Sequence, residues 1–270
     1  MTVDMSAKPN LLDTTFLFPV RIDSIDRLEN ICHVIEFIRS NFVTNFLVLE
    51  ADRLNTKLLQ KLLPEVVSLK FTEDLDPVFH RTYYINQLVK MATTPIVAIW
   101  DADVLVTKTQ IVKAVESIRT RNASFVSPYD GLTFDTSKIV RELYFKKGDY
   151  SVLERNKGKM NKIYGPDHVG GCFFARRQDY IDSGLENERF YGWGHEDGER
   201  VNRWKILGYQ FTRIDGCMFH LTHSRGLNSG YHTNKQGEIK KYELVRLAQL
   251  TRNEMLKEVK SWDETRLSEF

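Results

Sequence analysis

Cysteine, uncompensated charge and long apolar runs are all scarce in this chain of 270 residues. The three cysteines are odd in number and widely spaced, which argues against a disulfide framework and for a reducing compartment. The 38 basic and 36 acidic residues nearly cancel, so nothing in the charge favours a nucleic-acid partner. No apolar run approaches the roughly 20 residues that cross a bilayer, and the polar start is not a signal peptide. These absences predict a cytoplasmic protein without an integral membrane segment.

A hydrophobic content of 42% is enough to bury a sizeable core, so we expect a folded α/β domain. Strand-like and helix-like patterns alternate through the first half of the chain. Strands are expected at 15–20, 45–49, 66–71 and 95–100, and helices at 28–38, at 56–63 and from Asp76-Pro77 to about Met91. This alternation predicts a single domain built on a mostly parallel, twisted sheet flanked by helices.

The second half continues this order with a helix near 109–120 and strands near 124–127, 209–214 and 217–221. Residues 130–165 are polar and weakly helical in pattern, which indicates an insertion. Glycines and asparagines from Ser224 to Gly237 predict a mobile loop. We therefore expect a catalytic domain at 1–237, with the helical insertion at 130–165, and a helical tail at 238–270.

Two carboxylates, Asp101 and Asp103, directly follow the apolar segment at 95–100. In an open parallel sheet, ligands bind beyond the carboxyl ends of the strands, so both side chains are candidates for a site. A hard divalent cation held there would neutralise a diphosphate. The alternative is a solvated turn after a strand.

His220 and His223 stand three residues apart at the end of another expected strand. Two imidazoles with one carboxylate form a mixed nitrogen and oxygen ligand set, which suits manganese better than magnesium. One ligand with one packed or surface histidine is the alternative.

The segment Phe190-Tyr191-Gly192-Trp193-Gly194-His195-Glu196-Asp197 is the most specific motif of the chain. Its carboxylates open an expected helix, where acidic residues often only cap or complement the dipole. A tryptophan between two glycines, however, can form a wall on which a sugar stacks. Upstream, Gly170-Gly171 marks either a bulge or a close approach of the backbone to a ligand.

From Gly170 to Arg225 the chain resembles the C-terminal part of the β-1,4-galactosyltransferases and their bacterial relatives. The resemblance extends weakly to Pro19-Val20-Arg21, Phe79-His80-Arg81 and Asp101-Ala102-Asp103, and touches most of residues 13–235. These enzymes are inverting, metal-dependent transferases with the glycosyltransferase A fold. Golgi members carry a membrane anchor, so the resemblance implies a bacterial cytoplasmic enzyme or an excised catalytic domain.

By resemblance, Asp197 is the general base, and Mn²⁺ is held by Asp103, His220 and His223. The resemblance implies that sugars contact Trp193, Gly194, Glu196, Gly170, Gly171 and His168, and that the nucleotide contacts Pro19, Arg21, Phe79, Arg81, Asp101 and Arg225. From the residues alone, an arginine such as Arg81 is as well explained by a solvated helix face. The loop after His223 is expected to close over the donor.

Three positions depart from the family pattern. His168 stands where galactose-using members have an aromatic residue, His220 where the family often has methionine, and Gly198 where an acidic run continues. The expected activity is transfer of a hexose, galactose first, from a UDP-sugar to a glycan or glycolipid hydroxyl. The alternatives are a UDP-N-acetylgalactosamine or UDP-glucose transferase in polysaccharide synthesis, or a catalytically idle sugar- or nucleotide-binding protein.

Overall fold

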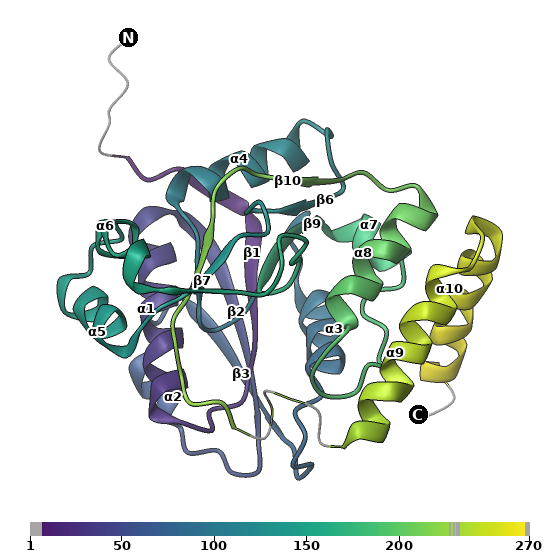
Figure 1. Ribbon diagram of the computed structural model, residues 1–270, viewed down its shortest axis with the longest axis horizontal. Helices are drawn as coiled ribbons and strands as arrows, with labels where there is room; N and C mark the ends of the chain where they lie inside the picture. The colour runs from purple at the N-terminus through teal and green to yellow at the C-terminus, as the bar shows by residue number, and fades with distance from the viewer. Residues whose placement is uncertain (1–6, 227, 229, 231–232, 268–270) are drawn as a thin grey trace.

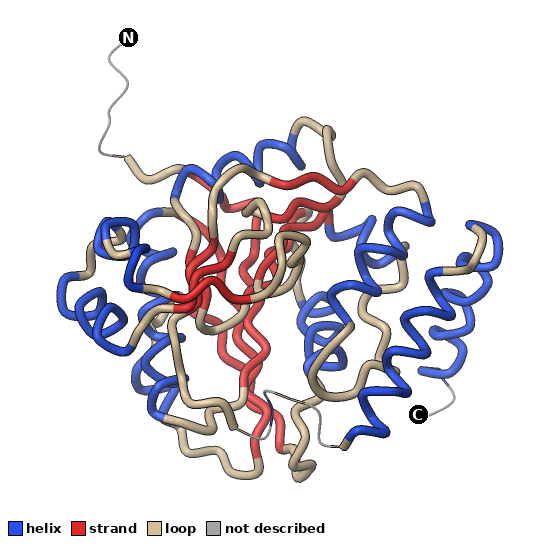
Figure 2. Tube along the Cα trace, viewed as in Figure 1, coloured by secondary structure: helices blue, strands red, loops and turns tan. Residues whose placement is uncertain are grey.

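The fold is built on a seven-stranded sheet with the order β10-β6-β9-β4-β1-β2-β3 (Figures 1 and 2). The computed structural model describes residues 7–226, 228, 230 and 233–267, with side chains to 262. The strands are β1 (Asn10–Val20), β2 (Val43–Asp52), β3 (Val67–Glu73), β4 (Ile96–Trp100), β6 (Phe125–Ser127), β9 (Cys172–Arg176) and β10 (Phe211–Arg213). Only β9 runs antiparallel to its neighbours, β4 and β6. The prediction of a mostly parallel α/β sheet is confirmed.

A second, four-stranded sheet has the order β5-β11-β7-β8. Its strands are β5 (Val104–Leu105), β7 (Thr133–Asp135), β8 (Asn161–Ile163) and β11 (Met218–His220). Strand β5 follows the two carboxylates directly, and His220 pairs with Val104 across the antiparallel β5–β11 ladder. The backbone N–H of Leu221 also donates to the carbonyl of Asp103 at 2.7 Å. This small sheet therefore joins parts of the site that lie over a hundred residues apart in sequence.

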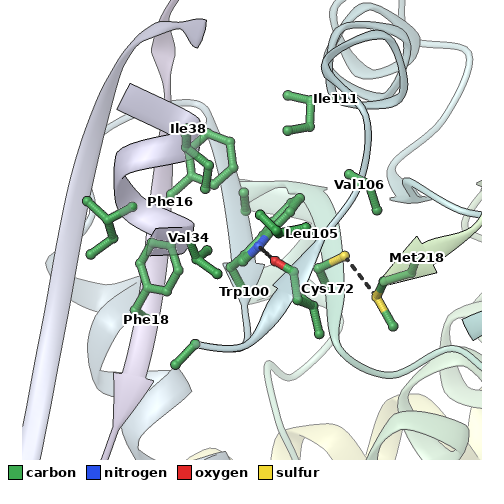
Figure 3. Packing of buried hydrophobic residues seen from close by; sticks show 14 of the residues in the cluster. Phe16, Phe18, Val34, Ile38, Trp100, Leu105, Val106, Ile111, Cys172 and Met218 are labelled. Atoms are coloured by element: carbon green, nitrogen blue, oxygen red, sulfur yellow. Dashed lines mark hydrogen bonds between the residues drawn. The ribbon is translucent and has the colours of Figure 1, made fainter. Parts of the chain in front are cut away.

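Helices cover both faces of the large sheet. One face packs against α1 (Ile25–Asn41), α2 (Leu58–Leu62) and α4 (Lys108–Arg119). The same apolar cluster continues into α5 (Lys138–Lys147) and α6 (Ser151–Arg155), and α6 is followed by the 3₁₀ turn η1 (Lys157–Lys159). Helix α5 packs on α1, where Arg141 donates to Asn30 and Glu29. The other face packs against α3 (Arg81–Met91), α7 (Arg177–Asp182) and α8 (Glu196–Leu207). Phe16, Phe18, Val34 and Trp100 meet in the first core, where the indole N–H of Trp100 donates to the Val104 carbonyl at 3.0 Å (Figure 3). This core supports the turn that carries Asp101 and Asp103.

Two further helices, α9 (Asn234–Ala248) and α10 (Arg252–Leu267), lie beside α8 (Figure 1). They share a separate apolar cluster with α8 and the loop before it, formed by Phe190, Leu207, Leu247, Met255, Val259 and Trp262. The expected boundary at 237/238 falls inside α9. The C-terminal helices thus pack directly behind the helix that carries Glu196 and Asp197.

Three local predictions differ from the structure. The helix expected to start at Asp76-Pro77 begins at Arg81. The preceding residues form a turn, in which the Asp76 carboxylate accepts a hydrogen bond from the N–H of Val78. Arg21 also donates hydrogen bonds to the carbonyls of Asp76 and Pro77. The loop expected to reach Gly237 ends at Thr233, whose hydroxyl caps α9; residues 227, 229, 231 and 232 of that loop lie outside the described part. The insertion at 130–165 contains two strands of the small sheet besides its helices.

The cysteines Cys32, Cys172 and Cys217 are all free thiols, as their spacing predicts. Over the described residues, no helix has the length and apolar character needed to cross a membrane.

Candidate active site

One pocket of about 350 Å³ opens at the carboxyl ends of β1 and β4, between the large sheet, the small sheet and the start of α8. It is lined by nearly all of the residues that the sequence singles out: Pro19, Arg21, Phe79, Arg81, Asp101, Asp103, His168, Gly171, Trp193, Gly194, Glu196, Asp197, His220, His223 and Arg225. Gly170 does not line the pocket and lies directly behind it, against Asp197. The fold therefore gathers these separate sequence motifs around a single cavity.

Asp103, His220 and His223 form a cluster of candidate metal ligands whose donor atoms all lie within 4.8 Å of one another. Nε2 of His223 lies 3.1 Å from Oδ2 of Asp103, and Nε2 of His220 lies 3.7 Å from Oδ1. Asp103 is buried at 5% exposure. One carboxylate and two imidazoles thus converge on one point at the wall of the pocket.

Both imidazole rings are oriented by hydrogen bonds through their other nitrogen. Nδ1 of His220 bonds to Oδ1 of Asp135 at 2.7 Å, and Nδ1 of His223 bonds to the carbonyl of Ser224 at 2.9 Å. Since both partners are acceptors, each Nδ1 carries a proton, and each Nε2, which faces Asp103, is the atom that would bind a metal. A carboxylate or carbonyl behind a ligating histidine is the usual arrangement at protein metal sites. The donor set therefore fits a divalent transition metal.

The charge on Asp103 is retained despite its burial. Burial alone would raise the pKa of Asp103, but the neighbouring His220 and His223, with the guanidinium of Arg27, hold it well below its ordinary value. Nη1 of Arg27 lies 3.9 Å from Oδ2 of Asp103. An ionised carboxylate is the form that binds a cation.

Arg81 lies between the carboxylate of Asp101, after β4, and the carboxylates of Glu196 and Asp197, at the start of α8. Its Nε and Nη2 donate to Oδ1 of Asp101 at 3.1 and 2.6 Å. Its Nη1 lies 3.8 Å from Oε1 of Glu196 and 3.9 Å from Oδ1 of Asp197, and has no hydrogen-bond partner within the described part of the chain. The Arg81 side chain, 17% exposed, therefore faces three carboxylates and does not lie on a solvated helix face.

The turn before α8 is held in an unusual backbone conformation. Gly192, Gly194 and His195 all have positive φ, at 75°, 103° and 71°. Two contacts from α9 support this turn: Nζ of Lys240 donates to the carbonyl of Trp193 at 2.7 Å, and Nε2 of Gln236 donates to that of Tyr191 at 3.4 Å. The indole of Trp193 remains 37% exposed beside the pocket. Glycine on both sides thus permits the turn that presents this ring.

Glu196 and Asp197, at the start of α8, differ in their protonation. Burial, with the adjacent charge of Asp197, raises the pKa of Glu196 to about 7. Burial also acts to raise the pKa of Asp197, but the charges of Arg200 and Arg81 hold it below its ordinary value. Neighbouring carboxyl groups whose pKa values are pushed apart are typical of acid–base sites. At neutral pH Asp197 is the ionised member of the pair.

Gly170 and Gly171 make close contacts that exclude a side chain. A Cβ on Gly170 would lie 2.5 Å from Oδ2 of Asp197 and 2.9 Å from Nε2 of His168. Gly171 has a φ of 84°, and its carbonyl accepts from the N–H of Asp101 at 2.8 Å. The glycine pair therefore lets the backbone pass between the carboxylate turn after β4 and Asp197.

His168 is held by two hydroxyl groups: its Nδ1 lies 3.1 Å from the Tyr129 hydroxyl and 3.0 Å from that of Thr133. Its ring stacks on Tyr164 with centroids 4.2 Å apart. Burial lowers the pKa of His168, so the ring is neutral near pH 7. His168 thus offers a fixed, uncharged ring to the pocket.

Arg21, which also lines the pocket, is occupied by contacts within the protein. It donates to the carbonyls of Ala51, Asp76 and Pro77 and pairs with Asp74. Its guanidinium also lies 5.5 Å from the centroid of Phe79. These contacts suit a residue that shapes the pocket better than one that is free to bind a phosphate.

Several residues at this site were missed in the sequence. Asp135 and Tyr164 lie in the segment interpreted as an insertion, and Arg27 and Arg200 lie on helices where a charged residue resembles a solvated face. Lys240 is only 3% exposed although it lies in a charged helix. No local pattern distinguishes these residues, since their partners come from distant strands and helices.

The comparisons with known proteins agree with this fold. Residues 156–225 match the family model described as the N-terminal domain of galactosyltransferase. The catalytic domain of Drosophila beta1,4galactosyltransferase 7 in complex with xylobiose aligns over 86% of this chain and 79% of its own, at 18% identity and TM-score 0.53. A mutant of that enzyme in complex with manganese, UDP-Gal and xylobiose aligns over the same shares at 17% identity and TM-score 0.54. No curated protein matches the sequence.

A mannosyltransferase from Pyrobaculum calidifontis, in complex with GDP-Man and Mn²⁺, is also similar in structure. It aligns over 95% of this chain and 74% of its own, at 16% identity and TM-score 0.51. The fold is therefore that of the glycosyltransferase A enzymes, and the predicted resemblance to galactosyltransferases is confirmed. The matched domain model and these structural neighbours are glycosyltransferases.

Proposed function

We propose that this protein is a glycosyltransferase, which moves galactose from UDP-galactose to a hydroxyl group of a glycan or glycolipid with inversion at the anomeric carbon. The observation that carries the proposal is the arrangement of two chemically different centres in one pocket. A cluster of metal-ligand type, around Asp103, faces an ionised carboxylate, Asp197, beside an exposed tryptophan. Sugar transfer needs both a charge-neutralised leaving group and a base for the incoming hydroxyl.

The leaving-group side of the pocket consists of Asp103, His220 and His223, which would hold Mn²⁺. The mixed nitrogen and oxygen donors favour this metal over Mg²⁺, which prefers oxygen ligands. When bound, the metal supplies positive charge to the diphosphate that departs from the sugar. Asp135 and the Ser224 carbonyl hold the two rings with Nε2 directed inward. We further propose that Pro19 and Phe79 border the nucleotide base, and that Arg225 and Asp101 contact the rest of the nucleotide.

In the same pocket, Asp197 takes the proton of the acceptor hydroxyl. Its low pKa keeps it ionised at working pH, as a general base requires. Trp193 offers a flat apolar face to an acceptor sugar, and Gly194 leaves room for it. Glu196, with a pKa near 7, binds sugar hydroxyls as either donor or acceptor. Attack on the face of the anomeric carbon opposite the leaving diphosphate would give the proposed inversion.

A second donor is favoured by one observation. His168 occupies the position where galactose-using relatives have an aromatic residue, and its fixed neutral ring presents Nε2 near Gly170 and Asp197. A nitrogen at this point can bond to a hydroxyl or to an acetamido group. UDP-N-acetylgalactosamine is therefore the second candidate donor. UDP-glucose, which carries the epimer of galactose, is the donor to compare with them.

The proposal is tested by incubating the protein with a panel of UDP-sugars and an acceptor library, with Mn²⁺, Mg²⁺ or EDTA, and measuring UDP release. We expect manganese-dependent release that is fastest with UDP-galactose, and a product of inverted anomeric configuration by NMR. Absence of release, and of slow donor hydrolysis, with every UDP-sugar would favour an idle binding protein.

Asp197→Asn separates catalysis from binding. Removing a general base costs about 10² to 10⁴ in rate, whereas UDP and Mn²⁺ are held by other residues. We expect near-parental binding of UDP with Mn²⁺ by calorimetry and transfer at least about a hundredfold slower. Parental turnover at an unchanged melting temperature would leave Asp197 as a structural partner of Arg200 and the base unassigned.

A further inference from the structure

Arg200 lies one helical turn after Asp197 on α8 and is buried at 1% exposure. Its Nη2 donates to Oδ1 of Asp197 at 2.5 Å. Its Nη1 donates to both Oε1 and Oε2 of Glu186, at 2.9 Å each. The guanidinium therefore connects the carboxylate in the pocket to a second carboxylate behind α8.

The anchor on Glu186 is rigid. The Tyr180 hydroxyl donates to Oε1 of Glu186, and the Glu186 backbone N–H donates to Oδ1 of Asn86 at 2.8 Å. The guanidinium also lies 4.2 Å from the centroid of the Phe173 ring. The Arg200 side chain is thus held by a buried carboxylate and an aromatic face as well as by Asp197.

The two oxygens of Asp197 have different surroundings. Arg200 donates to Oδ1, and Nη1 of Arg81 lies 3.9 Å from the same oxygen. Oδ2 points to the other side, toward Gly170, where a Cβ would approach it to 2.5 Å. The guanidinium contacts thus fall on Oδ1, and no hydrogen bond to Oδ2 is found among the described residues.

We propose that Arg200 is a positioning residue, which binds Oδ1 of Asp197 and thereby presents Oδ2 as the oxygen that accepts the acceptor proton. This inference rests on the proposed function, in which Asp197 is the base. In the step, the acceptor oxygen forms a bond to the anomeric carbon as its proton moves to Oδ2. The bond from that carbon to the diphosphate breaks, and its electron pair leaves with UDP. Arg200 remains protonated throughout.

Arg200 also keeps the base ionised, because its charge opposes protonation of Asp197. The other charged or titratable groups that act on Asp197 come from several elements: Arg81, Glu196, His168 and Asp101. Of these, only Arg200 donates a direct hydrogen bond to the Asp197 carboxylate among the described contacts. Its removal should therefore raise the pKa of Asp197, with the other groups unchanged.

Arg203 is a matched control on the same helix. It is 0% exposed, its Nε donates to Oε1 of Glu199 at 2.7 Å, and its Nη2 donates to the carbonyl of Leu185 at 2.8 Å. Like Arg200 it belongs to a buried ion pair, but its contacts lie away from Asp197. Comparing Arg200→Met with Arg203→Met separates the loss of a buried pair from the loss of the contact to the base.

The experiment measures kcat, KM and the pH dependence of kcat at saturating Mn²⁺ for the parent and both variants. For Arg200→Met we expect a fall in kcat of about tenfold to a hundredfold, as for a misplaced catalytic group, with the donor KM unchanged. The acid limb of its kcat profile should move to higher pH. Arg203→Met should keep the parental limb.

Two more variants cover a failure to fold. Arg200→Met/Glu186→Gln removes both buried charges together, and Arg200→Lys keeps the charge but cannot bridge both carboxylates. The double variant should reproduce the shift of the acid limb of the kcat pH profile to higher pH. Arg200→Lys should lower kcat while its acid limb stays close to that of the parent. A parental kcat and limb in every Arg200 variant that folds, or equal losses without a shift in Arg200→Met and Arg203→Met, would overturn the inference. A parent that transfers no sugar would instead reject the proposed function.

Discussion

Gly170→Ala provides a direct test of the geometry around Asp197. Gly170 does not have a positive φ, so alanine meets no backbone strain there. Its Cβ would lie 2.5 Å from Oδ2 of Asp197, and ordinary contact begins at 3.4 Å. The carboxylate must therefore retreat by about 0.9 Å. Because Arg200 holds the other oxygen of Asp197, this movement has to disturb that ion pair.

The size of the effect follows from this displacement. A misplacement of about 1 Å between reacting groups costs on the order of 10²-fold in rate, which is about 2.7 kcal/mol of activation free energy. We therefore expect kcat of Gly170→Ala to fall about a hundredfold. UDP and Mn²⁺ should bind as in the parent, because Asp103, His220 and His223 lie outside the contact.

The assay is steady-state UDP release with acceptor, paired with calorimetric binding of UDP with Mn²⁺ and with thermal unfolding. Gly158→Ala is the matched control, since a Cβ there meets no atom within 4 Å. It should change neither rate nor binding. If Gly170→Ala transfers sugar at the parental rate with an unchanged melting temperature, the close contact between Gly170 and Asp197 is wrong, and so is the assignment of Oδ2.

Three further predictions concern the metal site and the C-terminal helices. Asp103→Ala or His223→Ala should abolish manganese-dependent UDP binding in calorimetry without unfolding the protein; parental binding by both would reject the metal site. His220→Met should retain manganese-dependent activity, as the family commonly has methionine there, and complete loss would count against that alignment. Hydrogen bonds from Arg246 lower the folded pKa of Glu258 to about 2, from 4.5. The stability that this ion pair contributes is therefore present above about pH 4.5 and lost as pH falls toward 2. The melting temperatures of the parent and Glu258→Gln should differ most at neutral pH and converge near pH 2.

The sequence alone determined the chemistry that this chain carries and the order of its main elements. Residues 95–100 form a short apolar run that is typical of a buried strand, and this pattern predicted that Asp101 lies at a strand end. The block from Gly192 to Asp197 is specific because glycine on both sides of a tryptophan has few other uses. Patterns of this kind depend on neighbours within a few residues, which is why they can be recognised in one sequence.

The tertiary structure decided which groups hold and tune these residues. The β5–β11 pairing brings His220 to Asp103, and β7 brings Asp135 behind His220. Arg200 is connected to the base only because the loop before α8 buries Glu186. In each case, strand pairing or helix packing places a residue beside its partner in the site. A charged residue in a helical pattern looks the same in sequence whether it faces water or a buried carboxylate.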